Sequence, residues 1–97
     1  MTYRIIFRKK AESHVVDIRE WYEKQKSGLG DEFFLSIEAS LFAIERNPFL
    51  YQLRFKNIRC ASIQRFPYGI YYIIDQNTIV ILSVFHFKRN PKEWKKS

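Results

Sequence analysis

The sequence has only one cysteine, Cys60, and no apolar run near the ~20 residues that a membrane-spanning helix needs. A single cysteine excludes an internal disulfide, which makes a reducing cytoplasm the expected location. The N-terminal residues 1–10 contain too short an apolar stretch for a secretory signal, and most of their charges follow that stretch. We therefore expect a cytoplasmic protein with no membrane partner.

The sequence also lacks the motifs that mark common cofactor sites. It has no zinc-ligand spacing, no P-loop and no dinucleotide-binding fingerprint, so no metal or cofactor is expected. Glycine and proline are few, three of each, and no linker or low-complexity run divides the chain. With 97 residues, of which 46% are hydrophobic and 18% aromatic, residues 1–97 are predicted to form a single packed domain.

Acidic residues are scarce in the second half of the chain. Residues 1–53 carry eight Lys/Arg and eight Asp/Glu, whereas residues 54–97 carry nine Lys/Arg and only two Asp/Glu. The whole net charge of +7 therefore lies in residues 54–97. Basic charge confined to one half favours a polyanionic partner, either a nucleic acid or an acidic protein segment, over a merely solvated surface.

Two amphipathic helices are predicted in the first half. Residues 11–26 place apolar side chains at intervals of three and four, and a second helix begins near Asp31 with the same spacing. Residues 27–30 favour a helix end and a tight turn. Residues 47–48, Asn-Pro, stop the second helix because the residue before a proline is pushed out of the helical region. So short a connection predicts an antiparallel helical hairpin.

The remaining apolar segments have a β pattern. Residues 2–7, 57–65, 68–75 and 79–87 are rich in β-branched and aromatic residues, which predicts strands. Residues 75–78 favour a tight hairpin turn between the last two. The predicted fold class is α+β, in the order β-α-α-β-β-β, with an antiparallel twisted sheet and the helical hairpin packed on one face.

Basic side chains are expected to gather at one end of this sheet. Side chains alternate along a strand, which places Arg59 and Arg65 on one face, and His86 lies where the covering helices would end. Arginine makes bidentate contacts with phosphate oxygens, and histidine exchanges protons near neutral pH. The predicted active surface consists of Arg59, Arg65, His86 and Arg89, with Lys56, Tyr68, Lys88, Lys92 and Trp94 as contacts for a nucleic acid or another target.

Structural roles for some of these residues stay open. His86 taken alone is more often a structural histidine at a strand end than a catalyst. Arg59 and Arg65 could instead pair with helix carboxylates, and such surface pairs are worth only ~0–1 kcal/mol. His14 is interpreted as a surface residue. Cys60 is interpreted as a small buried hydrophobe, because no neighbouring base is evident.

Four segments in this order resemble the RelE/ParE superfamily of type II toxins, most closely its ParE-like branch: EWYEKQKSGLGDEFF, AIERNPFLY, IRCASIQRFPYGIYYII and IVILSVFHFKRNPKEW. Their most specific parts are the Arg59 position, the Arg-Phe-Pro-Tyr run that starts at Arg65, and the His-x-x-Arg-x-Pro-x-x-Trp ending that starts at His86. The resemblance covers residues 3–94. It implies the toxin of a plasmid-stabilisation or stress module, which a cognate acidic antitoxin wraps and blocks.

The resemblance also implies two possible targets. ParE-like members inhibit DNA gyrase without hydrolytic chemistry of their own, whereas RelE-like members are ribosome-dependent endoribonucleases that cut mRNA. In a nuclease His86 would be the base or the acid, and the three arginines would stabilise the phosphate. RelE-like enzymes often add a tyrosine near the C-terminus, but this chain has Trp94 there and no tyrosine after Tyr72. This difference favours inhibition of gyrase by binding.

Overall fold

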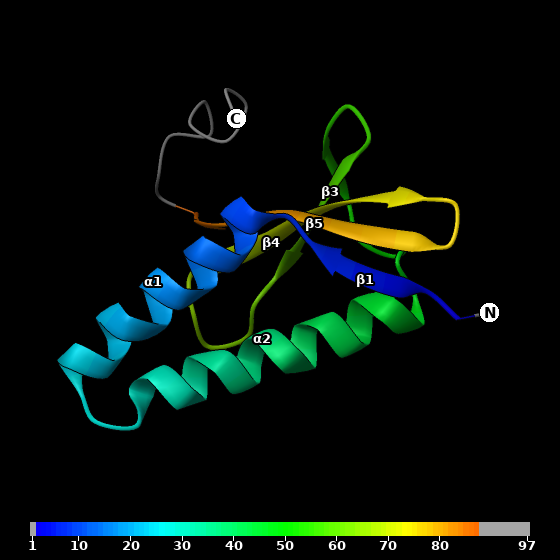
Figure 1. Cartoon of the computed structure of the whole chain (residues 1–97). Coiled ribbons are helices and arrows are strands. Elements are labelled where there is room, and N and C mark those ends of the chain that lie inside the picture. Colours follow the sequence, from blue (N-terminus) through cyan, green and yellow to red (C-terminus); the bar gives the residue numbers. More distant parts are fainter. Residues whose placement is uncertain (1, 88–97) are drawn as a thin grey trace.

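The computed structural model describes residues 2–87 (Figure 1). The elements in chain order are β1 (Arg4–Phe7), α1 (Lys9–Gln25), α2 (Leu29–Arg46), β2 (Leu53–Phe55), β3 (Ile58–Ser62), β4 (Tyr68–Asp75) and β5 (Thr78–His86). The strands form one sheet in the order β1-β5-β4-β3-β2, and the two helices form a hairpin that packs on one side of it (Figure 1). The predicted α+β class and the order of helices and strands are confirmed.

The turn between the helices depends on two glycines and one carboxylate. Gly28 has φ 89, a left-handed conformation that glycine adopts without steric cost. The Glu23 carboxylate accepts hydrogen bonds from the backbone N–H groups of Gly28 and Gly30, both at 3.0 Å, and so satisfies donors at the start of α2. A Cβ on Gly30 would stand 2.7 Å from the carbonyl oxygen of Arg19, so glycine allows the two helices to approach closely here.

The sheet is mixed. β1 runs parallel to β5, with Arg4 opposite Thr78, whereas β2 to β5 are joined by antiparallel pairings, as predicted. The short strand β2 is an addition to the four predicted strands. The predicted hairpin turn joins β4 to β5 through two residues, of which Gln76 has φ 55.

A β-bulge interrupts the β4–β5 pairing. Tyr71 pairs with Ser83 and Tyr72 pairs with Ile81, so Leu82 has no partner on β4. The extra residue changes the alternation of β5. As a result Val84 and His86 lie on the same face of the sheet as Ile81, the face that the helices cover.

Apolar side chains are buried on both faces of the sheet. The larger cluster lies between sheet and helices and includes Phe33, Ile37, Tyr72 and Ile81. A smaller cluster of Cys60, Tyr71 and Phe85 lies on the opposite face. Cys60 is buried, as predicted, and burial raises the pKa of its thiol despite a hydrogen bond with Tyr71 that lowers it. None of the helices within residues 2–87 is long and apolar enough to cross a membrane.

Candidate functional site

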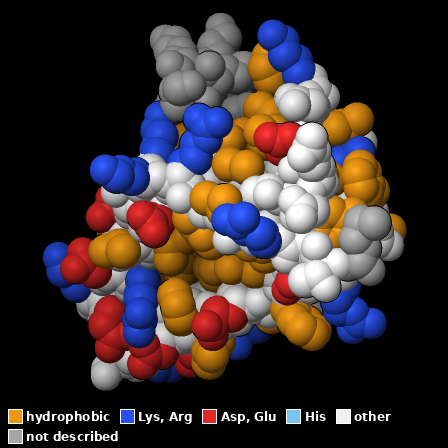
Figure 2. Space-filling model, turned by 45° about the vertical axis from the view of Figure 1, so that its right-hand side comes forward, with side chains coloured by type: hydrophobic (Ala, Val, Ile, Leu, Met, Phe, Trp, Pro, Cys, Tyr) orange, Lys and Arg blue, Asp and Glu red, His pale blue; other side chains and the backbone are white. Residues whose placement is uncertain are grey.

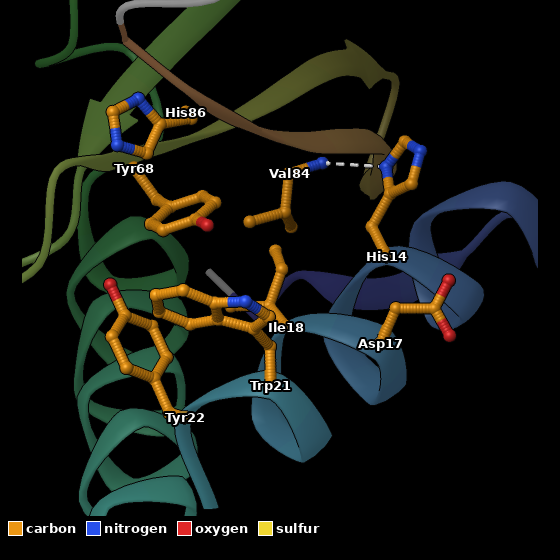
Figure 3. Close-up of a pocket in the computed structure, with 8 residues that line it drawn as sticks. All are labelled: His14, Asp17, Ile18, Trp21, Tyr22, Tyr68, Val84 and His86. Carbon is orange, nitrogen blue, oxygen red and sulfur yellow. Dashed lines mark hydrogen bonds between the residues drawn. The ribbon is translucent and has the colours of Figure 1, made fainter. Parts of the chain in front are cut away.

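A cavity of about 520 Å³ opens between α1 and the ends of β4 and β5. This volume lies within the range of small-molecule pockets. Figure 3 shows His14 and His86 at opposite ends of the cavity, with Val84 between them and the aromatic rings beneath. The cavity is lined by His14, Asp17, Ile18, Trp21, Tyr22, Tyr68, Val84 and His86.

His14 belongs to the packing between α1 and β5. The β1–β5 pairing ends at Phe7 opposite Ile81, so β1 does not cover the edge of β5 beyond that point. There the Nδ1 atom of His14 accepts a hydrogen bond of 3.2 Å from the backbone N–H of Val84 (Figure 3). The imidazole ring also lies 4.9 Å from the Phe85 ring. Nδ1 must be unprotonated to accept this bond.

The interpretation of His14 as a surface residue is therefore wrong. The side chain is half-buried and satisfies a backbone donor that the end of β1 leaves unpaired. A sequence signal for this role exists. His14 lies three residues after Ala11 and four before Ile18, on the apolar stripe of α1 rather than on its polar side.

His86 lies over an aromatic cluster. It is the last residue of β5 and pairs with Tyr68 across the sheet, and the two rings meet edge to face at 5.0 Å. Tyr68 is buried and packs in turn against Phe33 and Tyr22. Burial, and after it the neighbouring Tyr68, raises the pKa of Tyr22, so its hydroxyl keeps its proton at neutral pH. The structure thus brings together the predicted site residues His86 and Tyr68.

Arg59 lies at the other end of the same sheet. It pairs with Tyr72 on β4, four residues beyond the Tyr68 that pairs with His86. This offset and two strand spacings put the Cα atoms of Arg59 and His86 about 16 Å apart. The Arg59 guanidinium donates hydrogen bonds to the carbonyls of Phe49 at 3.2 Å and Tyr51 at 2.6 Å. It is thus engaged in holding the connection between α2 and β2.

Arg65 lies neither on β3 with Arg59 nor in the cavity with His86. It lies in the turn after β3, with φ 73, and forms an exposed ion pair of 2.6 Å with Glu32 of α2. Arg65 and Glu32 help to line a second hollow of about 430 Å³ between α2 and β3. Arg65 therefore faces a different hollow from His86. Among residues 2–87 the predicted group of Arg59, Arg65 and His86 does not converge on one cavity.

The other predicted contacts divide into two groups. Lys56, with φ 51, lies in the β2–β3 turn, and its Nζ atom stands 5.4 Å from the centre of the Phe55 ring. It is near Arg59 in the chain and at the same end of β3. Outside the described residues lie Lys88, Arg89, Lys92 and Trp94.

Sequence reasoning gave no site role to the five α1 residues that line the cavity: His14, Asp17, Ile18, Trp21 and Tyr22. The first helix was expected to bury one apolar stripe. Its two aromatic residues at positions 21 and 22 line the cavity, and Trp21 is exposed to solvent. In Figure 2 the Lys and Arg side chains are interspersed with acidic ones over the face shown, rather than gathered in one block. The described cavity offers aromatic surface and imidazole nitrogens, and no cluster within residues 2–87 is suited to hold a metal ion.

The family model of the ParE toxin of type II toxin–antitoxin systems, parDE, matches residues 5–91. The search of curated protein sequences gave no match.

Solved structures share the fold at low sequence identity. The chromosomal ParDE system of P. aeruginosa is 12% identical, with 88% of this chain and 96% of that chain covered and a TM-score of 0.78. The RelBE2 toxin–antitoxin complex of Mycobacterium tuberculosis is 22% identical, with 89% and 99% covered and a TM-score of 0.64. A mutant of the E. coli toxin RelE in the free state is 15% identical, with 99% and 93% covered and a TM-score of 0.63. At these identities the likeness concerns the fold.

Proposed function

Because this chain belongs to the ParE toxin family of type II toxin–antitoxin systems, we propose that it inhibits DNA gyrase by binding and that a cognate acidic antitoxin neutralises it. The observation that carries the choice of binding over RNA cleavage is that neither Arg59 nor Arg65 lines the cavity of His86. Each arginine also has a partner within the protein, which is a carbonyl pair for Arg59 and Glu32 for Arg65.

The chemistry of RNA cleavage explains why this separation matters. A nuclease of this kind needs a base for the 2′-hydroxyl, an acid for the leaving 5′-oxygen, and cations within hydrogen-bond reach of the phosphate. The Cα atoms of Arg59 and His86 are about 16 Å apart, and the Arg59 guanidinium is held by the carbonyls of Phe49 and Tyr51 rather than lining the cavity of His86. Inhibition by binding makes no such demand.

An antitoxin partner has independent support. The solved structures with this fold include toxin–antitoxin complexes. The excess of nine Lys/Arg over two Asp/Glu in residues 54–97 suits an acidic partner segment. The antitoxin would cover basic surface that the free toxin exposes.

A supercoiling assay tests the gyrase proposal directly. Purified chain is incubated with gyrase and relaxed plasmid, and the supercoiled product is separated on a gel. We expect supercoiling to fall as the toxin approaches equimolar amounts, and to recover when the protein encoded beside the toxin gene is added first. Undisturbed supercoiling at a stoichiometric excess of toxin would rule the proposal out.

A second candidate, ribosome-dependent mRNA cleavage, rests on the cavity itself. Two imidazoles, those of His14 and His86, line one cavity and belong to the residue type that most often transfers protons. Primer extension on translated message would then show codon-positioned cuts in the wild type that vanish in His86→Ala. Cuts that persist in His86→Ala would remove this histidine from the mechanism, and cuts that persist in His14→Gln would remove the other.

A further inference from the structure

The cavity between α1 and the sheet end is lined by a series of aromatic rings that meet edge to face. The centre of the Trp21 ring lies 5.1 Å from that of Tyr22, and the Tyr22 ring lies 6.3 Å from that of Tyr68. Tyr68 in turn meets the imidazole of His86 (Figure 3). Trp21 is 56% exposed, so part of its ring surface is available to a ligand. Indole and phenol rings carry partial negative charge on their faces.

The charged groups of this cavity differ from those of the protein as a whole. The chain has 17 Lys/Arg, yet none of the lining residues that the structure describes is a lysine or an arginine. Asp17, one helical turn after His14, is the one acidic residue among them. Its carboxylate makes no hydrogen bond or ion pair within residues 2–87. An anionic ligand would therefore meet a carboxylate without a lysine or arginine to offset it, whereas a cationic ligand would meet an opposite charge.

The kind of cation follows from the small number of hydrogen-bond acceptors in the cavity. A primary ammonium group has three N–H donors and a guanidinium has five, and each donor that loses its water needs an acceptor. Ile18, Val84 and the aromatic rings supply apolar wall, and Asp17 supplies the carboxylate. A nitrogen with four alkyl groups has no N–H donor to satisfy, and aromatic faces attract such a cation.

We propose that the cavity binds a small organic cation whose nitrogen is fully alkylated, that is, a quaternary ammonium compound. The alkylated nitrogen lies against the rings of Trp21 and Tyr22, and the carboxylate of Asp17 contributes the opposite charge. Neither inhibition of gyrase nor cleavage of mRNA uses such a ligand. The proposal therefore does not depend on which target the toxin has.

Three related probes test the choice of ligand. Choline, 3,3-dimethyl-1-butanol and ethanolamine are each titrated into the full-length chain at about pH 7.5, where imidazole is mostly neutral. Backbone amide NMR should show choline shifting residues 14–22 and 84–86. The alcohol, in which carbon replaces the charged nitrogen, should bind at least about tenfold more weakly. Ethanolamine keeps the charge but has three N–H donors, and it should also bind at least about tenfold more weakly.

Matched variants locate the ligand. Trp21→Leu removes the indole ring but keeps an apolar side chain, and Asp17→Asn removes the charge. Each should weaken choline binding at least about fivefold and binding of the neutral alcohol less than about twofold. The controls lie on α2 and line no part of this cavity: Phe42→Leu removes an exposed ring and Glu38→Gln an exposed carboxylate. Each control should change choline binding less than about twofold. All four side chains are exposed, so Tm should not fall.

Four results would overturn the proposal. Choline might fail to bind; the neutral alcohol might bind as tightly, in which case the cavity is selective only for apolar groups; or ethanolamine might bind as tightly, in which case alkylation does not matter. The fourth is an equal loss of choline binding in the cavity variants and in the α2 controls. Because neither gyrase nor ribosomes are present, a failure here would leave the proposed target of the toxin untouched.

Discussion

The hydroxyl of Tyr72 is expected to stabilise the fold through one buried hydrogen bond. Its ring is fully buried, and the hydroxyl donates to the carbonyl of Pro48 at 2.6 Å, 24 residues away in the chain. Burial raises the pKa of Tyr72 far above its ordinary value, more than Arg59 lowers it, so the proton needed for this bond stays in place. Tyr72→Phe removes a single oxygen atom, keeps the ring, and deprives the buried Pro48 carbonyl of this donor.

The expected loss of stability follows from leaving the Pro48 carbonyl without its hydrogen-bond donor. Leaving a buried acceptor without its partner costs about 1–3 kcal/mol in the free energy of unfolding. In a domain of this size each kcal/mol lowers Tm by about 4–8 °C. Urea unfolding of the wild type and Tyr72→Phe should show a lower midpoint with an unchanged m-value, because the same surface becomes exposed.

A second tyrosine supplies the control. Tyr3 is partly buried against the same core, and no hydrogen bond of its hydroxyl is present within residues 2–87, so Tyr3→Phe should change the free energy of unfolding by less than about 0.5 kcal/mol. If Tyr72→Phe also stayed within about 0.3 kcal/mol of the wild type, the hydroxyl would not be what anchors the α2–β2 connection, and the reasoning would be refuted.

Three further predictions concern other contacts. Arg59→Ala removes both bonds to the α2–β2 connection and should lower the free energy of unfolding in urea by about 1.5–3 kcal/mol. Burial raises the pKa of Tyr71 to about 12 from 10.0, so the unfolded chain releases this proton first. The free energy of unfolding should therefore fall as the pH rises from 10.0 to about 12. Urea unfolding of Tyr71→Phe over the same pH range should show a smaller fall. Gly30→Ala should lower Tm more than Gly28→Ala, since only at Gly30 does the new Cβ meet a backbone oxygen, whereas Gly28→Ala costs about 1 kcal/mol through its positive φ; equal losses would contradict this reason.

The helices were the most predictable part of the fold. Their apolar spacing and the stop before Pro48 place both elements within about two residues of those observed, because helix periodicity is local information. The short strand β2 was missed, since three residues carry too little pattern. The parallel pairing of β1 with β5 joins residues more than 70 positions apart, as in Arg4 with Thr78, and no local pattern specifies it.

The candidate site was less predictable for a related reason. Alternation along a strand determines on which face of the sheet a side chain lies, but it does not say which residues of different strands lie close together. Arg59 and Arg65 were expected to converge with His86, yet Arg59 lies on β3 and Arg65 lies in the turn that follows it, with φ 73. The register then places Arg59 beside Tyr72 and His86 beside Tyr68. The partners of the two arginines, carbonyls in one case and Glu32 in the other, depend on long-range packing.

The bulge at Leu82 should allow β5 to lose one residue without turning its later side chains to the other face of the sheet. Removing one residue from a strand normally turns every later side chain to the wrong face of its sheet. Leu82, however, is the residue that has no counterpart on β4, so the chain without it would still keep Val84 and His86 on one face of the sheet and Phe85 on the other. Natural relatives that are one residue shorter at this point can therefore keep the same cavity wall, and a sequence alignment should place a gap there.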